Sequence, residues 1–164
     1  MLGIYPGPIE TCQVFTDPEQ WSRPPGAVVA GLGPIGGLSA ASLARAIAHA
    51  SLTAALGHLT GGASAPSPEV RQVSLSSLLI GTGQGGLPVR DSVQALLTGV
   101  QRANDRLSDT QLAVHIAEIE VVELWQDRAL QAVEALESSL TNGELSDSFT
   151  ADLRLEERPG RQRR

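Results

Sequence analysis

The sequence predicts a single α/β domain in which helices pack on a largely parallel sheet. From Ala27 onward, short apolar runs rich in β-branched residues alternate with longer segments of helical periodicity. Gly accounts for 17 of the 164 residues and aromatic residues for only 3%, so the core must be built from Val, Ile, Leu and Ala. Alternation of this kind joins parallel strands through right-handed crossover connections.

The first half of the chain begins with a segment rich in Pro and Gly and then becomes apolar. A helix is expected to start after Ser39, a good N-cap residue, and to stop at Gly57, because glycine commonly ends helices. The expected features are, in order, a short strand at 10–15, a buried strand at 27–33 (AVVAGLG), a glycine-rich turn at 31–37, a helix at 39–56 and a polar loop at 57–69.

The second half repeats the alternation and ends in an arginine-rich tail. A helix is predicted from apolar residues at helical spacing, which are Val93, Leu96, Leu97, Val100 and Leu107. The other expected features are a buried strand at 73–81 (VSLSSLLIG), a strand within 113–124, a helix at 127–140, a last strand at 148–155 and a tail at 158–164. We therefore expect one domain over 1–157, followed by the tail.

Charge and composition exclude several classes of function. The net charge of -6 and the pI of about 5.0 argue against binding to the phosphates of nucleic acids. The chain has no Lys, which excludes Schiff-base chemistry and a Walker-type phosphate site. Cys12 is the only thiol, so an intrachain disulfide is excluded. No apolar run reaches the roughly 20 residues that span a bilayer, and we expect a soluble cytoplasmic domain, cut from a longer protein, with no membrane partner.

The most informative feature is a strand, a glycine-rich turn and a helix that occur twice. Both turns have the spacing G-x-G-x-x-G, met by Gly31, Gly33 and Gly36 in the first and by Gly81, Gly83 and Gly86 in the second. Glycine permits a sharp turn and lets a phosphate approach the N–H groups of a helix N-terminus. Two such loops at the ends of adjacent parallel strands would form a cleft for a pyrophosphate or nucleotide. The alternative is that the glycines serve turn geometry alone.

A dinucleotide-binding domain has a further requirement, an Asp or Glu about twenty residues past the first glycine loop that binds the adenosine ribose. Residues 20–68 contain no acidic residue. An NADP-type site would need an arginine there instead, and Arg45 lies within the predicted helix. An NAD(P)-binding, Rossmann-like oxidoreductase domain is therefore an alternative for which the sequence lacks the residue that would bind the ribose.

The two halves of the sequence, and the chain as a whole, resemble known families. The second half resembles that of a macro domain in SLLIGTGQGGLPVRDSVQALLTGVQRAN and IAEIEVVELWQDRALQAVEAL. The first half is similar to the amino-terminal macro-like domain of leucine aminopeptidases in GAVVAGLGPIGGLSAASLARAIAHASLTAAL. From Tyr5 to Gly160, the chain as a whole resembles a macro-like segment of large bacterial proteins that carry a CHAT (caspase-like) protease domain, with YPGPI, PPGAVV, LSSLLIGTG, DSV and DRA in that order. The resemblance implies a three-layer macro-like sandwich, with helices on both faces of a mostly parallel or mixed sheet.

The resemblance also implies a ligand site. The macro phosphate loop falls on Gly81, Thr82, Gly83, Gln84, Gly85 and Gly86, and the first loop falls on Gly31 to Gly37. The Asp that macro domains place against adenine, and the Asn of hydrolysing members, have no counterpart here. We therefore expect a non-catalytic module of a CHAT-type effector, without a cofactor, that binds a nucleotide or another phosphorylated small molecule. Its other partners would be the CHAT protease or other domains of the parent protein, and the alternative is a degenerate interaction or scaffolding module without ligand.

Side chains of the usual catalytic and metal-binding types are scattered. The residues that could hold a metal or form a Cys-His dyad are Cys12, His49, His58 and His115. Their spacing matches neither arrangement. Glu118 and Glu120 lie on one face of a predicted strand, where a solvated edge is the simplest explanation. We therefore assign no catalytic residue and no metal ligand, and the two Trp residues are too few for a base-stacking platform.

Overall fold

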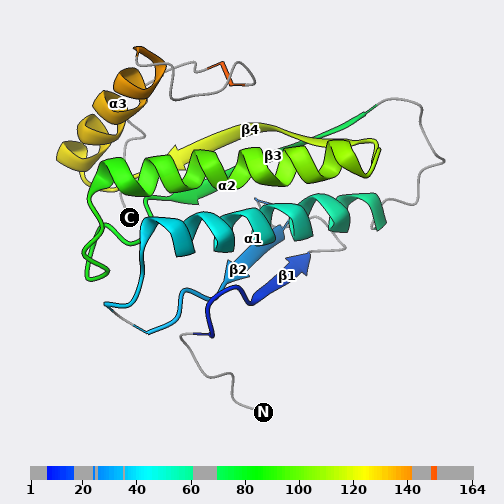
Figure 1. Ribbon diagram of the computed structural model, residues 1–164, viewed down its shortest axis with the longest axis horizontal. Coiled ribbons are helices and arrows are strands. Elements are labelled where there is room, and N and C mark those ends of the chain that lie inside the picture. Colours follow the sequence, from blue (N-terminus) through cyan, green and yellow to red (C-terminus); the bar gives the residue numbers. More distant parts are fainter. Residues whose placement is uncertain are drawn as a thin grey trace, which may run out of the picture.

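The computed structural model describes residues 7–16, 24, 26–34, 36–60, 70–141 and 149–150. Its helices and strands are, in chain order, β1 (Cys12–Thr16), β2 (Gly26–Ala30), α1 (Ala40–Thr60), β3 (Arg71–Leu78), α2 (Val89–Asp109), β4 (Val114–Val122) and α3 (Gln126–Thr141). Figure 1 shows α1 and α2 side by side, with β3 and β4 behind α2 and with β1 and β2 below α1. The described chain is a small α/β fold, as the alternation of elements predicts.

The strands form two small sheets instead of the single largely parallel sheet that the alternation predicts. β1 pairs with β2 in an antiparallel ladder, and β3 pairs with β4 in a parallel ladder. Alternation does not reveal which strands pair, because pairing depends on contacts between residues far apart in sequence. The strand expected at 148–155 lies outside the described residues apart from Phe149 and Thr150, which form no strand, and the tail at 158–164 also lies outside them.

Helix α1 begins where the sequence predicts but ends later. Ser39 caps it, because its backbone N–H donates to the Ser42 Oγ (2.9 Å) and its own Oγ accepts from the Ser42 N–H (3.2 Å). The stop expected at Gly57 is wrong, since the helix continues through this residue without the positive φ of a C-terminal cap. The Arg71 guanidinium donates to the His58 carbonyl (2.8 Å), so the last turn is stabilised by a residue of β3.

The hydrophobic core lies between α1, α2 and one face of the β3–β4 sheet. Its largest fully buried apolar side chains are Leu43, Val100 and Leu107. The two helices approach closely at Gly99, where a Cβ would lie 2.7 Å from the Ile47 Cβ and 2.8 Å from the Ala44 carbonyl oxygen. The lack of a side chain at Gly99 of α2 therefore allows the two helices to approach this closely.

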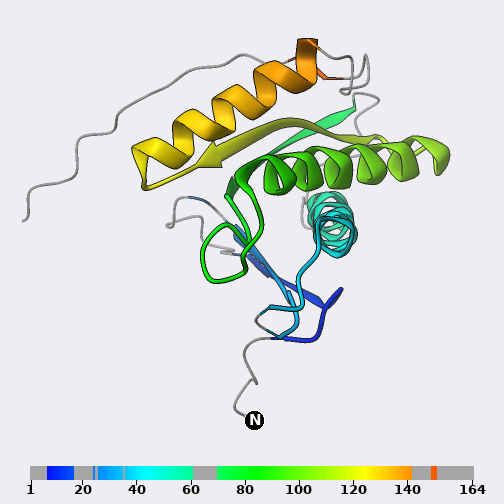
Figure 2. The ribbon, with the colours of Figure 1, turned by 60° about the vertical axis from the view of Figure 1, so that its left-hand side comes forward.

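Side-chain and helix contacts attach β4 and α3 to α2. The Asn104 amide donates to the Ile116 carbonyl (3.0 Å) and accepts from the Ile116 N–H (2.9 Å). The amide thus takes the place of the backbone groups of a neighbouring strand. Helix α3 packs against α2, with Ala132 and Ala135 buried beside Val93. Figures 1 and 2 show α3 on the side of α2 opposite α1. Within the described residues no helix covers the second face of the β3–β4 sheet, so the three-layer arrangement remains a prediction.

Candidate functional site

The first glycine loop is closed by the chain's own amino-terminal segment. The Gly31 N–H donates to the Thr11 carbonyl (2.7 Å), and the Gly33 N–H donates to the Gly7 carbonyl (3.1 Å). Gly31 is buried, and a Cβ there would overlap the Pro8 carbonyl oxygen. Backbone carbonyls therefore already use two of the N–H groups on which a phosphate site in this loop would depend.

The last glycines of the first loop form a turn at the surface. The Gly37 N–H donates to the Pro34 carbonyl (3.1 Å). Gly36 has a φ of +83° and is exposed, and a Cβ there would meet no atom within 4 Å. Gly36 is therefore required by backbone conformation alone.

The second glycine loop joins β3 to α2 and closes on itself. Gly81 (φ +82°) and Gly86 (φ +71°) adopt the left-handed conformation that favours glycine. The Leu87 N–H donates to the Gly81 carbonyl (2.9 Å), and the Gly86 N–H donates to the Gly83 carbonyl (3.2 Å). A Cβ at Gly85 would lie 2.7 Å from the Gly81 carbonyl oxygen. Turn geometry thus accounts for Gly81, Gly85 and Gly86, which are three of the four glycines in this loop.

The tip of the second loop is open. Gly83 and Gln84 are exposed, Gly85 is half-buried, and no described residue accepts a hydrogen bond from the N–H group of any of the three. A Cβ at Gly83 would meet no atom within 4 Å, and its φ is not positive. The Thr82 hydroxyl donates back to the Leu79 carbonyl (3.2 Å), so its proton is engaged within the loop. Successive backbone N–H groups beside a helix N-terminus are the donors of many anion sites.

Apolar side chains fill the space where the two loops meet. A Cβ at Gly81 would lie 2.7 Å from the Leu87 Cδ1 and 2.9 Å from the Leu38 Cδ2. Leu38 ends the first loop and Leu87 ends the second. In addition, β2 and β3 belong to different sheets, so the loops do not follow adjacent strands. The predicted polar cleft between them is wrong, because two leucines occupy that place.

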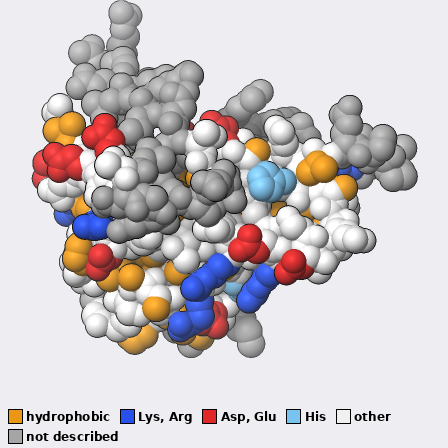
Figure 3. Space-filling view, turned by 45° about the horizontal axis from the view of Figure 1, so that its top comes forward, with side chains coloured by type: hydrophobic (Ala, Val, Ile, Leu, Met, Phe, Trp, Pro, Cys, Tyr) orange, Lys and Arg blue, Asp and Glu red, His pale blue; other side chains and the backbone are white. Residues whose placement is uncertain are grey.

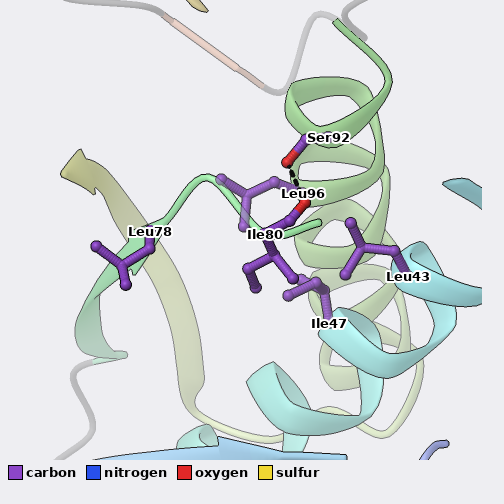
Figure 4. A pocket seen from close by; sticks show the side chains of 6 residues that line it. All are labelled: Leu43, Ile47, Leu78, Ile80, Ser92 and Leu96. Atoms are coloured by element: carbon purple, nitrogen blue, oxygen red, sulfur yellow. Dashed lines mark hydrogen bonds between the residues drawn. The ribbon is translucent and has the colours of Figure 1, made fainter. Parts of the chain in front are cut away.

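A gap beneath the second loop is also unsuited to a ligand (Figure 4). Its lining residues are Leu43, Ile47, Leu78, Ile80, Ser92 and Leu96. The gap has no room for a water molecule. The Ser92 hydroxyl, which is its only polar side chain, donates to the Ile80 carbonyl (2.8 Å). Leu78 points away from the other five side chains.

The helix turn that follows the candidate loop carries charges of both signs. In the first turn of α2, Arg90 is exposed and Asp91 is half-buried. Figure 3 shows arginine and acidic side chains next to one another, and the described side chains on that face form no continuous basic surface. A continuous basic surface would be expected of a protein that binds nucleic acid backbones.

The remaining candidate side chains do not come together. Those named for a metal or a dyad lie on different elements, Cys12 on β1, His49 and His58 on α1 and His115 on β4. In the part of the chain that is described, no three His, Cys, Asp or Glu side chains are placed to hold a metal ion. Glu118 and Glu120 share an exposed face of β4 and accept hydrogen bonds from Ser74 (3.0 Å) and Ser76 (2.7 Å).

Comparison of the chain with models of known protein families, with curated proteins and with solved structures finds no match. No helix among the described residues combines the length and the apolar character needed to span a bilayer.

Sequence reasoning missed the leucines that lie between the two loops and the carbonyl groups that close the first loop. Leu38 and Leu87 each follow a pair of glycines, so the repeated sequence Gly-Gly-Leu is the signal that could have marked them. The carbonyl groups of Gly7 and Thr11 carry no side-chain signal, because any residue type presents the same acceptor.

Proposed function

We propose that the chain is a non-catalytic macro-like module that binds a phosphate group at the tip of its second glycine loop. The phosphate would belong to a nucleotide or to another phosphorylated small molecule. The observation that carries the proposal is the set of successive N–H groups, at Gly83, Gln84 and Gly85, from which no described residue accepts a hydrogen bond. Such groups gain the most from an anionic acceptor, because they exchange only water for it.

The helix that follows the loop supports the same location. Helix α2 has 21 residues, and its N-cap residue, Pro88, makes no side-chain capping hydrogen bond. The positive end of the helix dipole favours an anion beside it, and Asp91 in the first turn is the one acidic side chain that the helix itself supplies there. Arg90 is exposed in the same turn, next to the half-buried Asp91, so this turn carries charges of both signs.

The ligand would contact the second loop alone. A pyrophosphate bound across both loops would need the N–H groups of Gly31 and Gly33, which already donate to backbone carbonyls. It would also have to displace Leu38 and Leu87. The same two obstacles weigh against the NAD(P)-dependent oxidoreductase alternative, which depends on the first loop.

The resemblance to CHAT-associated proteins suggests where such a module would act. We propose that it is a sensory or scaffolding part of a CHAT-type effector, with the protease or other domains of the parent protein as partners. Catalysis would then belong to another domain, and the glycine loop would only report the presence of a phosphorylated ligand.

The second candidate function is a protein-interaction module without a ligand. Its specific support is the first loop, where amino-terminal backbone fills the place of a phosphate, together with the leucine contact between the loops. In that case all glycines would serve turn geometry, and the N–H groups at the loop tip would bind only water.

A titration of the purified chain separates the two candidates. ADP-ribose, ATP and NAD are titrated in turn at moderate salt by calorimetry, first into the natural chain and then into Gly83→Asp and its uncharged match Gly83→Asn. Both substitutions point into open space from a residue without positive φ, so both should fold. We expect saturable binding of at least one probe and a loss of about tenfold or more in Gly83→Asp relative to Gly83→Asn, because a carboxylate repels the phosphate.

Flat titrations with all three probes would count against the proposal and in favour of the interaction module. Binding that is equal in the two variants would place the ligand elsewhere on the chain.

A further inference from the structure

The segment that closes the first glycine loop is a short strap of residues 7–11 (dark blue in Figure 1). One end of the strap is fixed, because the Gly31 N–H donates to the Thr11 carbonyl (2.7 Å) and so continues the ladder between β1 and β2. At the other end, the Gly7 carbonyl accepts from the Gly33 N–H (3.1 Å). The strap is thus joined to a sheet at one end and to the first loop at the other.

The turn inside the strap is strained at Glu10. The Thr11 N–H (3.2 Å) and the Thr11 hydroxyl (2.6 Å) both donate to the Pro8 carbonyl, which defines a β-turn over 8–11. Glu10, the third residue of this turn, has a φ of +66°, a conformation that favours glycine or asparagine. A Cβ at Gly31 would overlap the same Pro8 carbonyl oxygen, so the turn rests directly on the first loop. The turn therefore carries a conformational cost that other contacts must offset.

The side chain of Glu10 provides such a contact. The Arg45 Nε, on α1, donates to the Glu10 Oε1 (2.5 Å), so an ion pair holds the turn against the helix. The two side chains are about half exposed, 54% for Arg45 and 47% for Glu10. An ion pair with this exposure contributes little to stability, and salt weakens it. The ion pair is therefore a contact of modest strength that depends on the salt concentration.

The strap has no buried apolar side chain. Pro8 and Ile9 are exposed, and Gly7 has no side chain. By contrast, Val100 is buried in the core between α1 and α2. Segments that bury little apolar surface open at a much lower free energy than the core. Hydrogen bonds and the ion pair are therefore what hold the strap closed.

We infer that the strap opens from the first glycine loop while the rest of the chain stays folded, and that the ion pair between Glu10 and Arg45 holds it closed. Thr11 is the hinge, because its carbonyl belongs to the extended β1–β2 ladder. Opening frees the Gly33 N–H and uncovers Gly31, whereas closure withholds both from a ligand. The strap is thus an autoinhibitory cover whose closure weakens as salt rises. The inference does not depend on ligand binding by the second loop.

Native-state hydrogen exchange tests the inference. Exchange of the Gly33 amide is measured by NMR in the ¹⁵N-labelled full chain, without urea and in about 1 M urea, below the unfolding transition. Because a local opening exposes little surface, the Gly33 rate should change by less than about twofold. The Val100 amide, within α2, should exchange more slowly than Gly33 without urea, and it should speed up by about fivefold or more in urea, because it exchanges through global unfolding.

Substitutions at the ion pair test its role. Glu10→Gln and Arg45→Gln each remove one charge and keep a polar side chain, and each should speed the exchange of the Gly33 amide by about two- to fivefold. The charge-exchanged pair, Glu10→Arg with Arg45→Glu, should restore the rate of the natural chain to within about 1.5-fold. The matched control, Asp105→Asn, removes one charge from an exposed position of α2 and should leave the rate unchanged within the same limit. Gly33 is adjacent to none of these residues in the sequence, so the intrinsic exchange rate of its amide stays the same.

Salt supplies a second test of the ion pair. Raising the salt concentration from about 0.05 M to about 1 M screens the attraction between exposed charges. The Gly33 amide of the natural chain should then exchange faster by about twofold or more, relative to Glu10→Gln under the same conditions. The variant is the reference because it has no ion pair to screen.

Three results would overturn the inference. A Gly33 rate that rises with urea as steeply as that of Val100 would mean that the strap opens only when the chain unfolds. A Gly33 amide that exchanges at its intrinsic rate would mean that the strap does not close. Rates that are the same in the natural chain and in both Gln variants would show that another contact holds the strap.

Discussion

Gly33 and Gly83 are the second glycines of two loops with the same spacing, yet their N–H groups have different surroundings. The Gly33 N–H donates to the Gly7 carbonyl (3.1 Å), whereas no described residue accepts from the Gly83 N–H. Gly31 differs again, because it is buried where a side chain would overlap the Pro8 carbonyl. Substitutions at these residues should therefore separate structural glycines from the glycine of a ligand site.

The first prediction contrasts Gly31 with Gly83. Gly31→Ala should destabilise the chain by about 1–3 kcal/mol, because its Cβ would overlap the Pro8 carbonyl and the amino-terminal segment must shift. Gly83→Ala should change the free energy of unfolding by less than about 0.5 kcal/mol, since its Cβ enters open space. Urea denaturation of both variants measures the difference. Equal stabilities would show that the contact between Gly31 and residues 7–11 does not hold in solution.

The second prediction uses the same change in two helices. Gly57→Ala in α1 should stabilise the chain by about 0.5–1 kcal/mol, because Ala favours a helix and the new Cβ lies 4.0 Å from the Val14 Cγ1. Gly99→Ala in α2 should instead destabilise it by about 1–3 kcal/mol, because its Cβ would lie 2.7 Å from the Ile47 Cβ. Thermal and urea unfolding measure whether each substitution raises or lowers the free energy of unfolding. Stabilisation by both substitutions would mean that α1 and α2 are farther apart than described.

At the scale of elements, helix α2 organises the molecule. It packs against α1 through Gly99, against α3 through Val93, and against β4 through Asn104. The Asn104 amide satisfies both backbone groups of Ile116 on an edge of the sheet. An edge strand with free N–H and C=O groups would pair with other chains, and this contact prevents such pairing at one point.

The third prediction concerns this contact. Asn104→Ala should destabilise the chain by about 1–3 kcal/mol, because the N–H and C=O of buried Ile116 lose their partner. Asp105→Ala, at the next and exposed position, should change stability by less than about 0.5 kcal/mol. Denaturant titration of both variants measures the contrast. If the two substitutions cost the same, the amide bridge contributes nothing to stability.

The helices and strands are largely predictable from the sequence, whereas their ends and pairing are not. Hydrophobic spacing predicts α3 and β4 within two residues of their observed bounds, and the apolar residues predicted for α2 lie within that helix. The error at Gly57 arises because a guanidinium from β3, on Arg71, stabilises the turn that glycine was expected to end. The division into two sheets also escapes the sequence, since neither periodicity nor turn residues specify strand neighbours.

At the scale of the whole molecule, the sequence predicts where the two glycine loops lie but not which of them is open. The spacing of glycines identifies both strand-loop-helix units, and four of its six glycines, Gly33, Gly36, Gly81 and Gly86, have positive φ. The same pattern cannot reveal that residues 7–11 fill the first loop, because that contact uses backbone groups from a distant segment. Tertiary contacts therefore decide which of two equal motifs stays open.

The two faces of the β3–β4 sheet differ in burial. Helices α1 and α2 cover one face, where Val73, Val114 and Ile116 are buried, whereas Ser74, Ser76 and Leu78, on the other face of β3, are exposed.

The most direct test of phosphate binding by the second loop is a titration of the ¹⁵N-labelled chain with ADP-ribose and ATP, followed through its backbone amide signals. The account predicts saturable shifts at Gly83, Gln84 and Gly85 and in the first turn of α2, because these N–H groups would gain an anionic acceptor. The amides of Gly31 and Gly33 should not shift, since they donate to backbone carbonyls. Shifts confined to the first loop, or no shifts with either ligand, would contradict the account.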